Sequence, residues 1–202
     1  MAAATVTATA YPYPDGSDNT KSRRILYGTL AFQASPALYE TGGLPISFLG
    51  INDENNLIQV TQGPYANRVE MSSRSGSGYV YSYTTADLWV KLFTSVSAVL
   101  GQSVVVANPA TNILNLFTIT TAGTTGSTEP VWVFPNPSNP NPTTTDNGAV
   151  WTAQGPTSGL VQVLQSAGSA APNSEITGNS AIPAGVSGDV VSFKAEFVNA
   201  KA

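Results

Sequence analysis

The chain has 202 residues, enough to bury one sizeable core, or one core with a small appendage. Only 10% of the residues are charged, against about 25% in an ordinary soluble domain, which argues against surface helices with a charged outer face. The net charge of −4 argues against nucleic-acid binding, because phosphate contacts need clustered Lys and Arg. We therefore predict an all-β protein: a compact antiparallel sandwich or barrel body with an extended N-terminal arm and a small β insertion.

The chain has no cysteine and no histidine. A disulfide framework and thiol chemistry are therefore excluded, and so are the commonest general base and metal ligand. The opening residues lack the pattern of a secretory signal, and no stretch approaches the ~18 continuous apolar residues of a membrane span. We expect synthesis in a cytoplasm and no membrane partner.

Residues 1–22 form a polar, proline-containing arm that cannot bury enough apolar surface to order itself. Either a partner subunit holds this arm or it folds back on its own domain, and the sequence leaves both open. Tyr11 and Tyr13, followed by Arg23 and Arg24, suit a partner contact, because aromatic residues and arginine are enriched at interfaces. We expect removal of 1–22 to leave the body folded and to weaken its attachment to a partner.

Alternating apolar residues predict the main body, which we assign to residues 23–100 and 158–202. Strands are expected at 24–32, 45–50, 57–61, 67–72, 160–165 and 189–198. In the first strand, one face holds Leu26, Gly28, Leu30 and Phe32; in the last, the inward residues are Val191, Phe193, Ala195 and Phe197. A hairpin is predicted over 79–95 with its turn at 84–87, and Tyr79, Tyr81 and Tyr83 share one face of its first strand.

Residues 101–157 are predicted to form the small projecting β insertion. Its expected strands are 103–107, 113–120, 129–134 and 148–153, with a turn at 146–148 leading into the last one. The Pro-rich tract between the last two strands cannot be an interior strand, because proline donates no ladder hydrogen bond. We expect Trp132 and Trp151 to build the core of this insertion; a sugar-stacking pair at its tip is the alternative.

The candidate catalytic carboxylates are few, and they are Asp53, Glu54, Glu70, Glu129 and Asp146. A glycosidase needs two carboxyl groups on either side of the scissile bond, but each of these residues lies in a turn or on a polar strand face. The acidic stretches 15–19 and 52–56 contain oxygen ligands without the spacing of an EF-hand loop. We therefore predict no catalytic, cofactor or metal site, and a protein that is not an enzyme.

Three stretches resemble head-associated structural proteins of tailed bacteriophages. They are residues 23–48 (RRILYGTLAFQASPALYETGGLPISF), 78–93 (GYVYSYTTADLWVKLF) and 179–197 (NSAIPAGVSGDVVSFKAEF). Residues 121–132 (TAGTTGSTEPVW) and 145–155 (TDNGAVWTAQG) resemble a small module that recurs in phage virion proteins, including fibres. The resemblance covers most of residues 23–198 and includes no catalytic signature.

The resemblance implies a capsid decoration (cement) protein, a class that works through its surfaces. Its implied partners are the major capsid protein and further copies of the chain, in a trimer or, as second choice, a dimer. Its implied place is the capsid exterior of the virion, after synthesis in the host cytoplasm. The alternative is a phage fibre or receptor-binding module that contacts host glycans through residues 124–151. The chain shows no repeats or coiled-coil heptads of the kind common in fibres, which favours the capsid.

Overall fold

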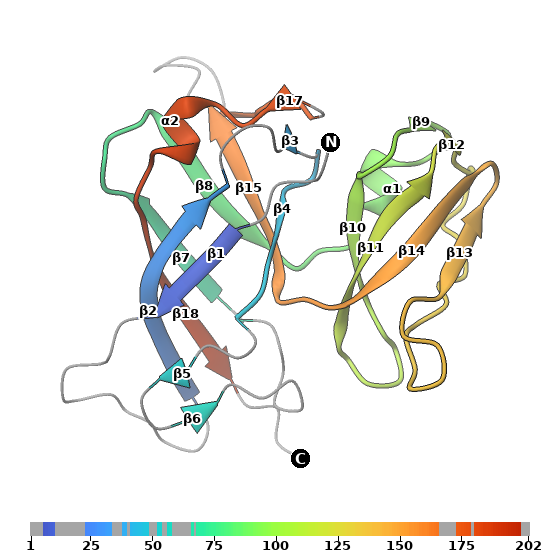
Figure 1. Cartoon of the computed structure of the whole chain (residues 1–202), viewed down its shortest axis with the longest axis horizontal. Helices are drawn as coiled ribbons and strands as arrows, with labels where there is room; N and C mark the ends of the chain where they lie inside the picture. Colours follow the sequence, from blue (N-terminus) through green and yellow to red (C-terminus); the bar gives the residue numbers. More distant parts are fainter. Residues whose placement is uncertain are drawn as a thin grey trace.

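The computed structural model describes residues 6–10, 23–33, 38–39, 41–48, 52–53, 56–57, 66, 68–165, 173–178 and 180–198. These residues form two lobes made mainly of antiparallel sheets, so the predicted all-β class is confirmed (Figure 1). We call residues 87–156 the second lobe, and we call the remainder the body.

The body is a sheet that curls round towards a barrel. Its strands are β1 (Val6–Ala10), β2 (Arg23–Phe32), β4 (Leu44–Ile46), β7 (Arg68–Ser73), β8 (Tyr79–Thr84), β15 (Gly159–Gln165), β16 (Ser174–Glu175) and β18 (Val191–Val198). Pairings run from β8 through β15, β4, β1, β2 and β18 to β7, all antiparallel except β1 with β4. Strands β7 and β8 then lie side by side, which brings the two ends of the series together. Short pairs β3 (Leu38–Tyr39) with β17 (Ser180–Ala181) and β5 (Asn52–Asp53) with β6 (Asn56–Leu57), and helix α2 (Ala184–Ser187), complete the body.

The predicted inward faces of β2 and β18 are confirmed. Their alternate residues are buried: Leu26, Gly28, Leu30 and Phe32 on β2, and Val191, Phe193, Ala195 and Phe197 on β18. Phe48 packs against both Phe193 and Phe197, with ring centroids 5.4 and 5.7 Å apart. Strict alternation gives each strand one apolar face, and the curled sheet encloses these faces in one core.

Part of the expected N-terminal arm belongs to the body. Residues 6–10 form β1, which pairs with β2 from Val6 opposite Phe32 to Ala10 opposite Gly28, and Val6 is buried. For these five residues the second alternative holds, in which the segment folds back on its own domain, because backbone pairing on both sides of β1 orders a segment with few large apolar side chains. Residues 11–22, including Tyr11 and Tyr13, lie outside the described residues.

The second lobe contains a four-stranded sheet, a short strand pair and one helical turn. The elements are α1 (Trp89–Leu92), β9 (Ser97–Ala98), β10 (Ser103–Ala107), β11 (Leu114–Thr121), β12 (Gly123–Thr124), β13 (Thr143–Asp146) and β14 (Ala149–Pro156). The sheet order is β10-β11-β14-β13, and β12 pairs with β9. Its core is separate from that of the body and is built from Trp89, Phe93, Ala98, Val104, Val106, Phe117, Ile119, Ala149, Trp151 and Ala153. The lobe therefore begins before residue 101, the predicted start of the insertion.

The predicted hairpin over 79–95 is wrong in its second half. Strand β8 pairs with β15 rather than with residues 88–94, and residues 89–92 are helical. The Asp87 side chain accepts the Trp89 backbone N–H at 2.8 Å, which favours a helical turn over a strand at this point. Trp89 and Phe93 are four residues apart, so one helical face buries both of them in the second core.

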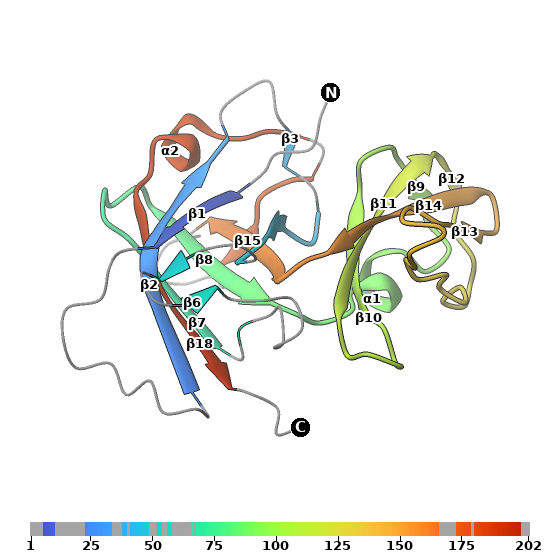
Figure 2. The ribbon, with the colours of Figure 1, turned by 60° about the horizontal axis from the view of Figure 1, so that its bottom comes forward.

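The second lobe is inserted into the turn of a hairpin of the body. Thr84 at the end of β8 pairs with Leu160 at the start of β15, and the whole lobe lies between them in sequence. Figure 2 shows both connections leaving the body at the same end. At the junction, Leu160 packs with Val105 and Leu114 of the lobe. One small apolar cluster therefore joins two separate cores.

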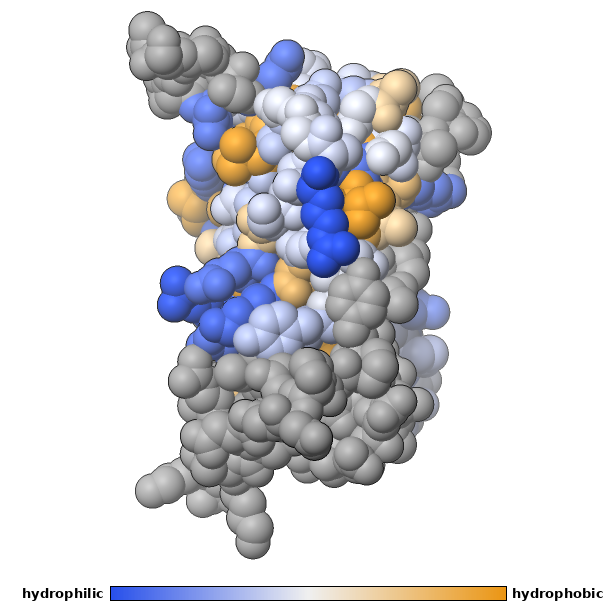
Figure 3. Space-filling model, turned by 90° about the vertical axis from the view of Figure 1, so that its left-hand side faces the viewer, coloured by the Kyte–Doolittle hydropathy of each residue, from blue (hydrophilic) through white to orange (hydrophobic). Residues whose placement is uncertain are grey.

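Large apolar side chains are scattered on the described surface of the body. The body face turned away from the second lobe shows small, separate groups of apolar side chains among polar ones (Figure 3). The exposed large apolar residues of the body are Val80 and Val190 in its described part. No helix among the described residues has the length and apolarity needed to cross a membrane.

Candidate functional site

A buried carboxylate organises the second lobe. Asp146, the last residue of β13, is only 3% exposed. Its Oδ2 accepts the indole N–H of Trp89 at 2.9 Å and that of Trp151 at 3.0 Å, while its Oδ1 accepts the Gly126 backbone N–H at 2.7 Å. A buried charge needs several donors, and these three tie α1, β14 and the segment after β12 to one side chain.

The two tryptophans predicted for this lobe pack against each other. Trp151 is fully buried, Trp132 is half-buried, and their ring centroids lie 5.6 Å apart in an edge-on arrangement. Trp132 also packs on Phe117, with ring centroids 4.6 Å apart, and its indole N–H donates to Glu129 at 2.5 Å. Trp151 has no exposed face for a sugar, so the pair serves the core of the lobe.

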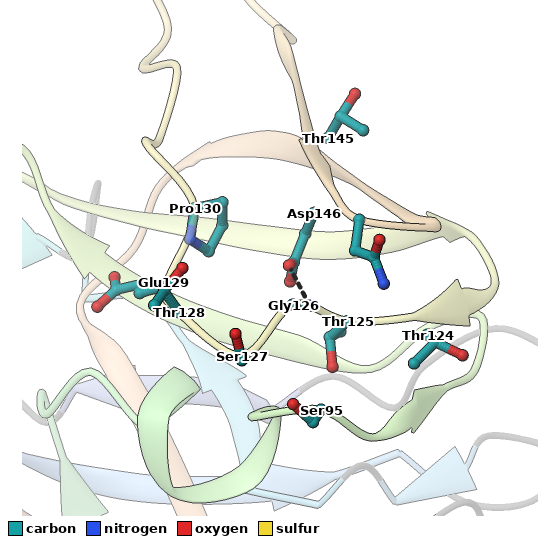
Figure 4. A pocket seen from close by; sticks show the side chains of 11 residues that line it. Ser95, Thr124, Thr125, Gly126, Ser127, Thr128, Glu129, Pro130, Thr145 and Asp146 are labelled. Atoms are coloured by element: carbon teal, nitrogen blue, oxygen red, sulfur yellow. Dashed lines mark hydrogen bonds between the residues drawn. The ribbon is translucent and has the colours of Figure 1, made fainter.

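Beside this carboxylate, the surface of the second lobe is hollowed into an open recess of about 590 Å³. Its walls are Ser95, residues 124–130 and residues 145–147 (Figure 4). Thr125 is buried in the wall, where its hydroxyl donates to the Phe93 carbonyl and accepts the Val96 N–H at 3.0 Å. The deep part of the recess is therefore fixed by hydrogen bonds within the lobe.

The rim of the recess carries unpaired polar groups. Six side chains of the lining residues make no hydrogen bond within the described part of the chain, although that of Thr145 points away from the recess (Figure 4), and they are Ser95, Thr124, Ser127, Thr128, Thr145 and Asn147. Five of the six have hydroxyl groups, which donate and accept, and the sixth has an amide. The lining contains no lysine and no arginine. These walls are suited to hydrogen bonding with a polar, uncharged molecule.

Two residues of the recess have left-handed backbone. Ser95 has φ 52° and Asn147 has φ 54°. Ser95 also donates its backbone N–H to the Gly126 carbonyl at 2.8 Å, which connects the two walls. Asparagine tolerates this conformation, whereas serine adopts it at a cost. The wall at Ser95 therefore holds a side chain where glycine would be less strained.

A carboxyl pair lies next to the recess. Glu129 lines the recess, and its carboxyl group lies near enough to that of Asp87 to influence the pKa of Asp87. Asp87 is exposed as a residue, but partial desolvation of its carboxyl group, together with the neighbouring Glu129, raises its pKa to about 6. The Trp89 N–H opposes this increase by stabilising the ionised form. The pair adds negative charge beside the recess.

A second buried carboxylate, that of Asp189, connects strands β7 and β8 of the body through hydrogen bonds. Asp189 is 4% exposed and accepts the hydroxyls of Ser73 at 2.9 Å, Ser77 at 2.7 Å and Tyr81 at 2.8 Å, and also that of Ser75. Burial by itself raises the pKa of this carboxyl, but the four hydroxyl hydrogen bonds outweigh it and lower the pKa to about 2. The cluster joins the link between β7 and β8 to Asp189, two residues before β18.

The residues predicted as sites do not gather in one place. Arg23 and Arg24 begin β2, where their backbones lie opposite Val198 and Phe197, and Asp53 lies in β5. Glu70 is exposed on β7 and forms an ion pair with Arg68 at 2.7 Å. Glu54 and the stretch 15–19 lie outside the described residues. Glu129 and Asp146 do meet, at the recess.

The arrangement favours binding over acid–base chemistry. Both carboxylates that line the recess are already hydrogen-bonded, Asp146 to three N–H groups and Glu129 to Trp132. No group of three or more Asp, Glu, His or Cys side chains placed to hold a metal ion occurs in the described ranges. In comparisons with known proteins, no family model, curated protein or solved structure matches the chain.

Proposed function

We propose that this chain is a non-enzymatic virion structural protein of a tailed bacteriophage, which binds the outer surface of the capsid as a decoration protein. In this proposal the body contacts the major capsid protein and the second lobe points away from the shell. The observation that carries the proposal is the two-lobed build: two β cores, with the second inserted at a single hairpin turn of the first. Such a build lets one lobe attach while the other remains accessible.

The described part of one face of the body supports attachment by many weak contacts. Its visible apolar side chains occur in small groups (Figure 3), whereas a stable one-to-one complex needs a larger continuous patch. A protein that binds an icosahedral shell repeats one modest contact many times, and avidity replaces a single tight interface. Shell-bound oligomers are symmetric, and by analogy with the phage proteins that the chain resembles we expect a trimer, or a dimer as second choice.

The described carboxylates support a structural role for the chain. Asp146 and Asp189 are buried acceptors of several hydrogen bonds. Glu175 likewise accepts the Tyr39 hydroxyl at 2.6 Å and the Gly42 N–H at 2.8 Å. These three groups hold segments together that are distant in sequence, and none of them forms the pair of facing carboxyl groups that glycoside hydrolysis requires.

A fibre or receptor-binding module remains the second candidate. The observation that favours it is the recess with unpaired hydroxyls, which lies within residues 124–147 apart from Ser95. In that case the second lobe contacts host glycans, as proposed for residues 124–151.

Co-sedimentation separates the two candidates. The purified chain is mixed with phage heads that lack decoration protein and, separately, with host cells, and the pelleted fraction is measured against protein concentration. Decoration predicts saturable pelleting with heads at a constant ratio to the major capsid protein. Pelleting with cells and not with heads would overturn it in favour of the receptor-binding candidate.

A further inference from the structure

We propose that the open recess of the second lobe, between Ser95, residues 124–130 and residues 145–147, binds an uncharged saccharide. The site is a property of the single chain and does not depend on attachment to a capsid. Trp132 and Trp151 do not line it, because they pack in the core of the lobe.

The chemistry of the rim matches a sugar. Sugar hydroxyls both donate and accept hydrogen bonds, and so do the serine and threonine hydroxyls of the rim. Unpaired polar groups include Ser127, Thr128 and the Asn147 amide, so the site does not have to break internal hydrogen bonds to bind a ligand. A polar ligand can replace the water on these groups without leaving buried donors unpaired.

The negative charge of the recess restricts the class of saccharide that can bind. Asp146 and Glu129 line the recess and Asp87 adjoins Glu129, while no lysine or arginine lines it. Phosphate, sulfate or sialic acid would meet like charge without a cation to balance it. We therefore restrict the ligand to neutral saccharides.

The site is preorganised by its own hydrogen bonds. Gly126 is held from both sides, because its N–H donates to Asp146 at 2.7 Å and its carbonyl accepts the Ser95 N–H at 2.8 Å. The backbone carbonyl of Thr124 accepts the Gly148 N–H at 2.9 Å, which fixes the backbone at that end of the recess. A wall fixed before binding loses less conformational entropy when the ligand arrives.

The left-handed residues provide a separate argument. Three non-glycine residues have positive φ in the described part of the chain, and two of them, Ser95 and Asn147, line the recess. Glycine would relieve the strain at Ser95 and would also suit Asn147. Strained backbone held at a site is a sign that the side chain serves a function there.

Size and openness set the expected affinity. A volume of about 590 Å³ lies within the range of small-molecule sites, roughly 300–1,000 Å³. Because the recess is open and lacks an aromatic platform, we expect dissociation constants on the order of 1 mM for a short oligosaccharide. Many copies on one particle would increase the apparent affinity.

The test uses the full-length chain and a glycan array that carries neutral and sialylated oligosaccharides. The protein is displayed in many copies on beads so that weak contacts are detected. The neutral glycan with the strongest signal is then titrated into isotope-labelled protein, and amide shifts are followed by NMR. We expect retention of neutral glycans only, with shifts confined to residues 95, 124–130 and 145–147. Retention of sialylated glycans alone, no retention of any glycan, or shifts elsewhere would overturn the proposal.

Three glycine variants provide the matched comparison. Ser95→Gly and Asn147→Gly remove a rim side chain at positions where glycine suits the backbone, so both variants should fold. Asn112→Gly makes the same change at φ 56° in the β10–β11 turn, outside the recess. We expect the double variant Ser95→Gly/Asn147→Gly to bind about tenfold more weakly, since two hydrogen bonds are lost. Asn112→Gly should bind like the parent; equal binding by all variants would place the ligand elsewhere.

Pelleting with heads is measured on the same variants and should not change, so the two proposals can fail separately.

Discussion

Trp89 and Trp151 donate their indole N–H groups to the same oxygen of Asp146, at 2.9 and 3.0 Å. The first tryptophan lies in α1 at the start of the second lobe, and the second lies in β14 near its end. Gly126 donates to the other oxygen of the carboxylate. One buried side chain therefore connects the start of the lobe to its end, and it also holds the wall of the recess at Gly126.

Asp146→Asn should destabilise the second lobe by about 3 kcal/mol, because the amide NH₂ would face N–H donors at one of the two carboxylate positions. The three tryptophans of the chain, Trp89, Trp132 and Trp151, all lie in the second lobe. Tryptophan fluorescence in a urea titration therefore reports on this lobe alone. Glu129→Gln, at an exposed residue that can still accept the Trp132 N–H, is the control. Equal stability of parent and Asp146→Asn would show that the carboxylate is not a support of the lobe.

The body should fold without the second lobe. We expect a variant in which residues 87–156 are replaced by Asn-Gly to keep the β8–β15 pairing, because Thr84 and Leu160 are already paired and a loop of seven residues would then connect them. The loss should not exceed about 2 kcal/mol, from exposure of Leu160, which packs on Val105 and Leu114. All eight tyrosines lie outside the lobe, so near-UV circular dichroism of tyrosine follows the body. A non-cooperative melt would show that the lobes fold as one unit.

Removal of residues 1–10 should destabilise the body by more than about 3 kcal/mol, because it removes β1 from between β2 and β4 and uncovers the core beside Val6. This replaces the expectation that residues 1–22 are dispensable for folding. The tyrosine signal should melt earlier, while the tryptophan signal of the second lobe is unchanged. A truncated chain as stable as the parent would contradict the position of β1.

The body should lose stability in acid through Asp189. Its carboxyl has a pKa of about 2 in the folded chain, against an ordinary value of 3.8. The unfolded chain therefore binds more protons between these values, so this stabilisation is complete above about pH 4 and is lost as the pH falls through about 2. Asp189→Asn should lower stability at pH 7 and flatten the pH dependence between 4 and 2, as measured by tyrosine circular dichroism. Parallel curves for parent and variant would rule out this carboxyl as the source.

Local patterning was sufficient to predict some of the fold. Strands β2 and β18 alternate strictly, and a curled sheet with one buried face is what such alternation specifies. Residues 79–84 were correctly predicted as a strand, but their partner was not, because β15 lies beyond the second lobe and long-range pairing leaves no local signal. At residues 87–93 two local signals compete, and the Asp87 turn with the Trp89–Phe93 spacing prevails over alternation.

The candidate site was predicted less well than the fold. Asp146 was identified as a carboxylate in a turn, but its burial depends on indole groups from two distant segments. The Asp189 cluster had no local signal, because Ser75 and Ser77 lie in the link between β7 and β8 and meet Asp189 only when the residues before β18 have packed beside it. The recess had none, since its walls meet only after α1, β12 and β13 have packed together.

The most direct measurement of the decoration proposal is electron cryo-microscopy of phage heads saturated with the full-length chain. We expect ordered density at one repeated capsid position, with the body against the major capsid protein and the second lobe directed into solvent. Heads without added density after saturation would contradict the proposal. Density with the second lobe against the shell and the body in solvent would contradict the assignment of the two lobes.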